Sequence, residues 1–209
     1  MIDKILDNAR DCEAHFFSNN DTRKIHATEV SRCTRLSYFE RKDPLPGDNI
    51  DRISMLVKKG LTRSFRNIDD EYKIDNNLTI QVTADLIFDD EFIVKFEIVS
   101  SLPEIPHPRD LLYLNACLFA FNKFHGVLIY ATEDGQSIEF SVTKSNRMFE
   151  EIVRRARVLS ALLTEGKPPI VEPSDSCVYC KYYGRCYNRE KKNSNYSLEN
   201  LLAFRKKIG

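Results

Sequence analysis

Residues 78–99, Leu-Thr-Ile-Gln-Val-Thr-Ala-Asp-Leu-Ile-Phe-Asp-Asp-Glu-Phe-Ile-Val-Lys-Phe-Glu-Ile-Val, form the stretch that decides the fold. Its β-branched and aromatic residues predict strands at residues 78–88 and 92–99, joined by the turn Asp89-Asp-Glu91. Another strand is predicted at residues 71–74, just before the turn Asp75-Asn-Asn77. The middle of the chain is therefore expected to form a β-meander.

Helical patterns lie on both sides of this meander. Before it, helices are predicted at residues 2–17, 28–42 and about 48–61. After it, helices are predicted at residues 110–121 and 144–165, with strands at 126–131 and 137–142 between them, and a short helix at 198–204. This order of elements predicts an α/β or α+β fold with a mixed sheet.

The composition is that of an ordinary soluble protein. The 209 residues are 42% hydrophobic and 30% charged, with a formal net charge of zero. That length suits one large domain, or one domain with a small lobe. The sequence shows neither an apolar run of transmembrane length nor a secretory signal pattern, so we expect a cytoplasmic protein without membrane contact, whose thiols stay reduced.

The charges are segregated along the chain. Residues 23–66 carry eleven Lys and Arg against five Asp and Glu, and residues 181–207 carry eight against two. Residues 67–104 carry two basic and ten acidic residues. Two interpretations stay open: solvated helix faces beside an acidic hairpin, or a polyanion-binding rim around a divalent-metal pocket.

Three cysteines lie within ten residues near the C-terminus. Cys177, Cys180 and Cys186 have the spacing C-x2-C-x5-C, which predicts most of a four-ligand metal site. The best candidate for the fourth ligand is Cys33, 144 residues before Cys177. A three-plus-one pattern favours an iron–sulfur cluster over a zinc ribbon. His26 is an alternative zinc ligand if Cys33 is not one, although a surface or capping role is also open.

These features together resemble the CRISPR-associated RecB-like iron–sulfur exonucleases of the PD-(D/E)xK superfamily. The resemblance covers roughly residues 25–187. Its most specific parts are Thr28-Glu-Val-Ser-Arg-Cys33 and the segment from Gly166-Lys-Pro-Pro to Cys186. It implies a restriction-endonuclease-like mixed central sheet flanked by helices, with an iron–sulfur lobe formed by the N- and C-terminal segments.

The resemblance also divides the chain and suggests partners. Residues 1–47 would be a helical segment that contributes one cluster cysteine, residues 48–166 the nuclease core, and residues 167–209 the cysteine lobe and tail. The implied cofactor is a 4Fe–4S cluster, or less often a 2Fe–2S cluster. The implied partners are DNA that is single-stranded or has single-stranded ends, and the CRISPR integrase, in antiviral defence.

The implied catalytic residues lie in the meander. Asp85 matches the metal-binding Asp of the family, and Glu97, twelve residues later, matches its acidic residue on the next strand. With the backbone carbonyl of Ile98, these carboxylates would hold Mg²⁺ or Mn²⁺. Val99 occupies the position of the family's lysine. Lys95 lies on the same strand face as Glu97 and is a candidate for a migrated lysine.

Other motif positions also depart from the family. Ser64 stands where the family has a His, and the family's Gln and Tyr correspond to Tyr113 and Cys117. Three hypotheses therefore remain open. The protein is a metal-dependent DNA nuclease with a modified active site, an inactive nuclease-fold module that binds DNA ends or an integrase, or an unrelated zinc or iron–sulfur scaffold.

Overall fold

The structure is a computed structural model that describes residues 21–45, 60, 68–89 and 91–187. The chain divides into two compact units, Met1–Ile170 and Val171–Gly209. The predicted helices at residues 2–17, 48–61 and 198–204 lie outside the described residues, apart from Gly60, and so does Ser64.

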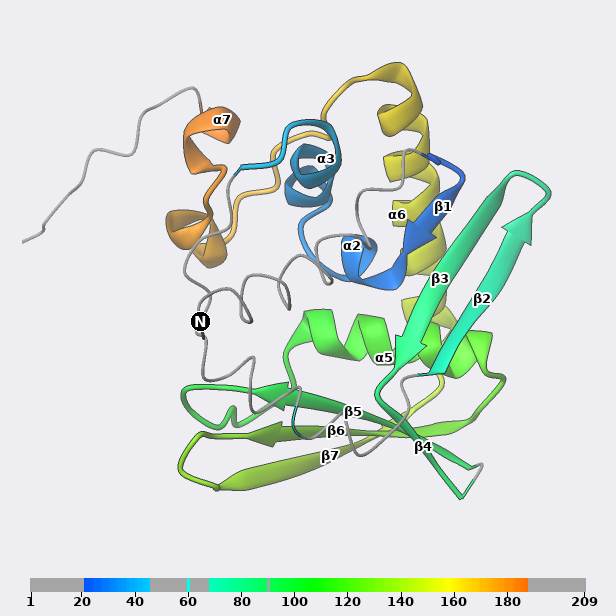
Figure 1. Ribbon diagram of the computed structural model, residues 1–209, viewed down its shortest axis with the longest axis vertical. Helices are drawn as coiled ribbons and strands as arrows, with labels where there is room; N and C mark the ends of the chain where they lie inside the picture. Colours follow the sequence, from blue (N-terminus) through cyan, green and yellow to red (C-terminus); the bar gives the residue numbers. More distant parts are fainter. Residues whose placement is uncertain (1–20, 46–59, 61–67, 90, 188–209) are drawn as a thin grey trace, which may run out of the picture. The chain divides into compact units, whose positions relative to one another are not determined.

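The described residues of the first unit form two β-sheets and four α-helices (Figure 1). The strands are β1 (Lys24–His26), β2 (Ile68–Asp75), β3 (Leu78–Ala84), β4 (Leu86–Phe88), β5 (Phe92–Ile98), β6 (His125–Ala131) and β7 (Ser137–Thr143). The helices are α2 (Ala27–Ser31), α3 (Thr34–Lys42), α5 (Pro108–Ala120) and α6 (Asn146–Glu165).

Both sheets are mixed. In the first sheet β3 lies between β1, which is parallel to it, and β2, which is antiparallel. In the second sheet the order is β4-β5-β6-β7, with β5 and β6 parallel and the outer pairs antiparallel. The mixed α/β class is therefore confirmed, but the strands do not form the single central sheet that was predicted.

The division between the sheets falls inside one predicted strand. Residues 78–88 were expected to form one strand, but β3 ends at Ala84 and β4 begins at Leu86. At Asp85 the chain leaves the pairing partners of the first sheet and joins those of the second. A continuous β-pattern in the sequence does not reveal such a change of partner, because both halves carry the same kinds of residue.

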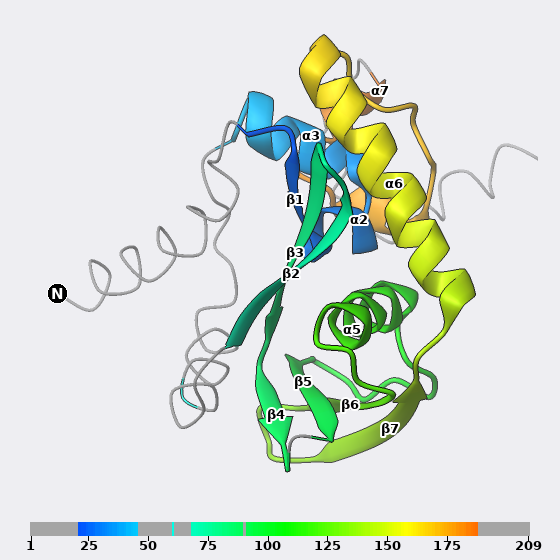
Figure 2. The same ribbon diagram turned by 90° about the vertical axis from the view of Figure 1, so that its right-hand side faces the viewer.

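Helix α5 packs against strands of both sheets and against α6 (Figure 2). The residues of α5 that face these elements are buried, among them Leu114, Ala116 and Leu118. Because α5 is apolar on several sides, it forms the centre of the first unit. Helix α6 is amphipathic, with a buried face of Phe149, Ile152, Ala156, Leu159 and Leu163.

The N-terminal part differs from the prediction in two ways. The single helix expected at residues 28–42 is two helices, because Arg32 and Cys33 have extended backbone angles between α2 and α3. Cys33 is the N-cap residue of α3 and is exposed. The three-residue strand β1 was not predicted. It pairs through its backbone with β3, more than 50 residues away in sequence, so no local pattern marks it.

A buried ion pair joins β1, α2 and α3. The Glu29 side chain is fully buried. Its Oε1 accepts a hydrogen bond from Arg41 Nε at 2.5 Å, and its Oε2 accepts one from Arg41 Nη2 at 2.6 Å. Glu29 Oε2 also accepts a hydrogen bond from the backbone N–H of His26 at 2.8 Å. Arg41 Nη2 donates in addition to the carbonyl of Lys24. These bonds fix α3, and with it Cys33, against β1.

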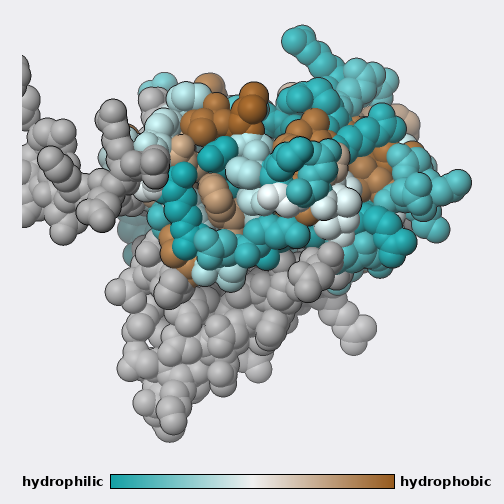
Figure 3. Space-filling model, turned by 90° about the horizontal axis from the view of Figure 1, so that it is seen from above, coloured by the Kyte–Doolittle hydropathy of each residue, from teal (hydrophilic) through white to brown (hydrophobic). Residues whose placement is uncertain are grey.

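On the face shown in Figure 3, hydrophilic residues separate several smaller apolar patches. Within the described part of the chain, no helix combines the length and the apolar character needed to cross a membrane.

Candidate functional site

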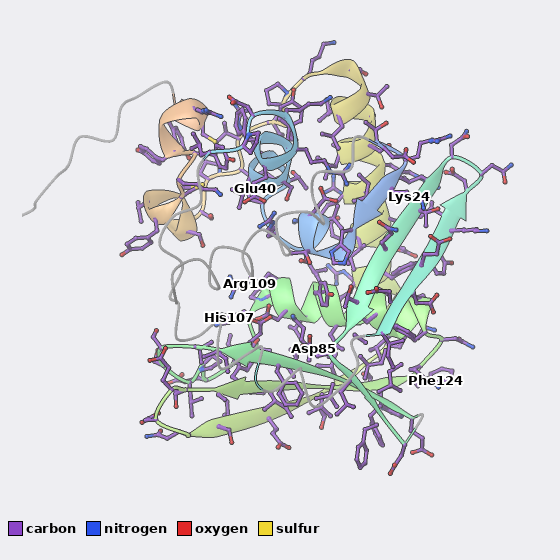
Figure 4. The ribbon with its side chains drawn as sticks, viewed as in Figure 1. Lys24, Glu40, Asp85, His107, Arg109 and Phe124 are labelled. Atoms are coloured by element: carbon purple, nitrogen blue, oxygen red, sulfur yellow. The ribbon has the colours of Figure 1, made fainter. Side chains whose placement is uncertain are left out.

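Asp85 stands at the junction of the two sheets, beneath α5 (Figure 4). Its Oδ2 atom accepts a hydrogen bond from the backbone N–H of Phe96 at 2.9 Å, which ties the junction to β5. Among the described residues, none donates a hydrogen bond to Oδ1. The change of sheet therefore holds one carboxylate half-buried beside β5, with an oxygen available to a ligand.

Lys95 and Glu97 project from the same face of β5, because side chains alternate along a strand. Lys95 Nζ lies 2.5 Å from Glu97 Oε1. Only 9% of Lys95 is exposed, which is unusual for a lysine and requires compensation by opposite charge. The two sequence-predicted residues are therefore brought together, with Asp85 bonded to the residue between them.

Helix α5 supplies the wall opposite Lys95. The ring centroid of Tyr113 lies 4.3 Å from Lys95 Nζ, a cation–π contact. The Tyr113 hydroxyl donates to the carbonyl of Thr83 at 2.7 Å and accepts from its backbone N–H at 3.3 Å. Because Thr83 lies two residues before Asp85, these bonds position α5 against the sheet junction. Tyr113, predicted at the family's Gln position, thus faces the candidate site.

A third acidic residue of this region, Asp110, was not predicted from the sequence. Asp110 lies in the first turn of α5 and is only 4% exposed. Its Oδ2 accepts a hydrogen bond from the Tyr130 hydroxyl at 2.8 Å, and Arg109 Nε lies 3.4 Å from Oδ1. The Tyr130 oxygen in turn accepts from the backbone N–H of His107 at 3.0 Å. The signal available in the sequence was the spacing of Asp110 three residues before Tyr113, which places both on one helix face.

The surroundings of Lys95 keep it charged. Burial lowers the pKa of Lys95, but the carboxylates of Glu97, Asp85 and Asp110 raise it, and the net direction is upward. The site thus contains a buried ammonium group among three carboxylates from three different elements.

Two other positions of the expected motif, 99 and 117, carry an apolar side chain and an unreactive thiol. Val99 packs against the hydrophobic core. Cys117 is buried, and burial raises the pKa of its thiol to about 12, so it stays protonated and unreactive. At positions 99 and 117 the side chains therefore do not supply the polar groups of the motif to which the sequence was compared.

The donor chemistry of the site suits a hard cation. Asp85 and Glu97 offer carboxylate oxygens, with the carbonyl of Ile98 next on the strand, and such oxygens are what Mg²⁺ and Mn²⁺ prefer. In the part of the chain that the structure describes, no three His, Cys, Asp or Glu side chains come together as a metal-binding group. The side chains of this site can therefore provide two carboxylate ligands, and a bound cation would take its remaining ligands from water and a phosphate.

His26 has a capping role. Its Nδ1 accepts a hydrogen bond from the backbone N–H of Thr28 at 3.3 Å and lies 3.0 Å from the Thr28 hydroxyl, while Nε2 lies 3.4 Å from Thr83 Oγ1. Burial lowers the pKa of His26 to about 4, so the ring is neutral. This agrees with the capping alternative and leaves neither ring nitrogen facing a described cysteine.

The C-terminal cysteines lie in the second unit, on short elements. Cys177 lies in the 3₁₀ helix η2 (Asp175–Tyr179), Cys180 follows it as C-cap, and Cys186 lies in α7 (Tyr183–Tyr187). All three are free thiols. The backbone N–H of Ser174 donates to Cys177 Sγ at 3.4 Å, and this bond and that of the Ser174 hydroxyl lower the pKa of Cys177. The turns thus favour a thiolate, as a metal ligand requires. Cys33 belongs to the first unit, and the four-cysteine site stays a prediction.

Comparisons with known proteins give one informative likeness. No protein-family model matches the sequence, and no curated protein matches it. Among solved structures, the crystal structure of SSO0001 superposes with a TM-score of 0.70 and 18% sequence identity, over 91% of this chain and 98% of that chain. This likeness shows a shared fold.

Two further structures are of an alkaline exonuclease, LHK-Exo, from Laribacter hongkongensis. The first has a TM-score of 0.47 at 10% identity, over 73% of this chain and 93% of that chain. The second, in complex with dAMP, has a TM-score of 0.48 at 11% identity, over 83% and 97%. These similarities are too low to support an argument.

Proposed function

We propose that this protein is a metal-dependent DNA nuclease of the CRISPR-associated RecB-like type, which cleaves DNA at single-stranded ends. The observation that carries the proposal is the meeting of Asp85, Glu97 and Lys95 at the junction of the two sheets. Asp85 and Glu97 would hold Mg²⁺ or Mn²⁺, which supplies an activated water and offsets charge on the phosphate. Lys95 would provide the positive charge beside them.

In this proposal each residue of the chain has a distinct task. The Phe96 N–H orients the Asp85 carboxylate through its 2.9 Å hydrogen bond. Tyr113 and the end of β3 exclude water from one side of Lys95, which strengthens its interaction with a phosphate. The basic character of residues 23–66 and 181–207 favours a polyanion as substrate.

The test is cleavage of end-labelled single-stranded DNA with Mn²⁺ or Mg²⁺. We expect Asp85→Asn and Glu97→Gln each to lower the rate by on the order of 100-fold or more, because each removes charge that the cation needs. Glu139→Gln is the matched control, since Glu139 is an exposed carboxylate on β7. Cleavage that survives Asp85→Asn would overturn the site assignment.

A second candidate function is a module that holds DNA ends or an integrase partner without cutting. The apolar surroundings of Val99 and Cys117, where the family has polar residues, favour it. Salt-sensitive DNA binding without cleavage in either metal, or a stable complex with a CRISPR integrase, would support this function instead.

We further propose that Cys33, Cys177, Cys180 and Cys186 hold an iron–sulfur cluster of the 4Fe–4S type. Protein purified without oxygen should be brown and contain about four iron and four sulfide per chain. Cys33→Ser or Cys180→Ser should lose the cluster, whereas Cys117→Ser, at a buried thiol that is not one of the four predicted ligands, should keep it. A colourless protein with stoichiometric zinc would favour a zinc site and contradict the proposed cluster.

A further inference from the structure

The candidate site already contains a cation of its own. The Lys95 ammonium lies 2.5 Å from Glu97 Oε1, in a position where Lys95 is 9% exposed. Glu97 is one of the two carboxylates that the proposed metal needs. A divalent cation bound to Glu97 at about 2 Å would stand next to this ammonium in a region of low dielectric constant, where like charges repel strongly.

A second carboxylate, Asp110, lies on α5, the helix that also contacts the Lys95 ammonium. Lys95 Nζ lies over the Tyr113 ring at 4.3 Å, on the side that faces α5. Asp110 is on the same face of α5 as Tyr113, one turn earlier, and its side chain is buried. Among the described residues its ion-pair partner is Arg109 rather than Lys95.

The Asp110 carboxylate is held in place by its neighbours. Tyr130 donates to Oδ2 at 2.8 Å, and Tyr130 is the residue of β6 that pairs in register with Glu97 of β5. In a parallel pair, residues in register project from the same face of the sheet, so Glu97, Tyr130 and Asp110 are neighbours on the face that α5 covers. The Glu97 carboxylate, which pairs with Lys95, and the Asp110 carboxylate, which Tyr130 holds, therefore lie on the same face of the sheet.

We propose that Lys95 is an internal competitor for the divalent cation at Glu97, and that Asp110 is the positioning residue that receives its ammonium when the metal binds. The lysine side chain has four rotatable bonds and can swing from one carboxylate to the other without a change in the backbone. In the metal-bound state Lys95 then stands between Asp110 and the cation, with its charge next to the phosphate.

This inference rests on the proposed function, because it assumes a cation site at Asp85 and Glu97. It makes Lys95 act in opposite directions in two measurements. Removal of the ammonium should strengthen metal binding, because the competitor is gone, and should weaken cleavage, because the charge beside the phosphate is gone. A purely structural lysine would weaken both.

The experiment measures Mn²⁺ affinity without DNA, by calorimetry and by the paramagnetic resonance signal of free Mn²⁺. We expect Lys95→Met to bind Mn²⁺ about tenfold more tightly than the wild-type protein, and Asp110→Asn to bind it several-fold more weakly. In the Lys95→Met background, Asp110→Asn should have no effect, because there is no ammonium left to receive. Glu139→Gln is the control and should match the wild-type protein.

The outcomes separate the two proposals. Mn²⁺ binding that Lys95→Met leaves unchanged or weakens overturns the inference while the metal site stands, and Lys95→Gln repeats the test if the Met variant does not fold. Weaker binding of Asp110→Asn in the Lys95→Met background overturns the receiving role, because Asp110 then acts on the metal directly. No Mn²⁺ binding by either protein overturns both the metal site and this inference.

Discussion

Protonation of His26 should destabilise the first unit between pH 6.5 and about 4. Burial lowers the pKa of this ring from 6.5 to about 4; the charges of Lys95, Arg32 and Arg41 lower it too, while Asp69 raises it. The geometry agrees, because Nδ1 accepts from the backbone N–H of Thr28 and a proton there would break that bond. The folded protein therefore keeps His26 neutral at pH values where the unfolded chain already binds a proton.

The sign and the magnitude follow from this difference. A base whose pKa is lower in the folded state contributes stability above its unfolded pKa and loses it as the pH falls toward the folded pKa. Each pH unit in which only the unfolded chain is protonated costs about 1.4 kcal/mol. From pH 6.5 to about 4, His26 alone should therefore remove on the order of 3 kcal/mol.

The assay is urea unfolding at several pH values for the wild-type protein and for His26→Asn. Asparagine is a good N-cap residue and does not titrate, so it keeps the helix start without the charge change. Between pH 6.5 and 4, the unfolding free energy of the wild-type protein should fall more steeply with pH than that of His26→Asn. The difference in slope should correspond to about one proton taken up on unfolding. Parallel pH profiles for the two proteins would refute the neutral, buried histidine.

Two further predictions concern the packing that positions the site. Arg41→Met should cost about 3–5 kcal/mol in urea unfolding, because it leaves the buried Glu29 carboxylate without its partner, and Glu29→Gln in the same chain should recover part of this loss; equal stability of Arg41→Met and wild type would contradict the buried pair. Gly126→Ala should cost about 1–3 kcal/mol in the same measurement, because a Cβ there would lie 3.0 Å from the Ile93 carbonyl oxygen and from both Leu114 methyl groups; an unchanged unfolding midpoint would show that β5, β6 and α5 are less closely packed than described.

The elements with strong local patterns were predictable from the sequence. Helices α5 and α6 were predicted to within two residues at each end, because apolar residues mark both and Gly166 marks the end of α6. Strands β5, β6 and β7 were also predicted close to their observed bounds. In each case the information lies within the element itself.

The features that were missed depend on contacts between distant segments. The break at Asp85 arises because β3 and β4 pair in different sheets, and strand β1 exists because it pairs with β3. The Asp110–Tyr130 hydrogen bond joins residues 20 positions apart, which meet only because α5 crosses the face that β6 presents. A sequence pattern carries no direct record of such meetings. Asp85 and Glu97 were predicted from the resemblance to a family motif, and Lys95 from its place on the same strand face as Glu97.

The position of the lysine limits how this site can work. Position 95 lies in β5 and position 99 follows the end of β5 at Ile98. Each is two residues from Glu97, so in an extended chain a lysine at either position can contact that carboxylate. Their backbone atoms nevertheless stand about 13 Å apart along an extended strand, with Glu97 between them. A lysine at position 95 therefore approaches the carboxylates from the side of Tyr113 and Asp110, where it is buried and already paired. If the protein cleaves DNA, the phosphate has to meet the lysine on that side, and the ammonium has to leave Glu97 before the cation can bind. Under the proposed function, a lysine at position 95 can place its charge beside the phosphate only after it has left Glu97, which is why metal affinity and cleavage have to be measured separately.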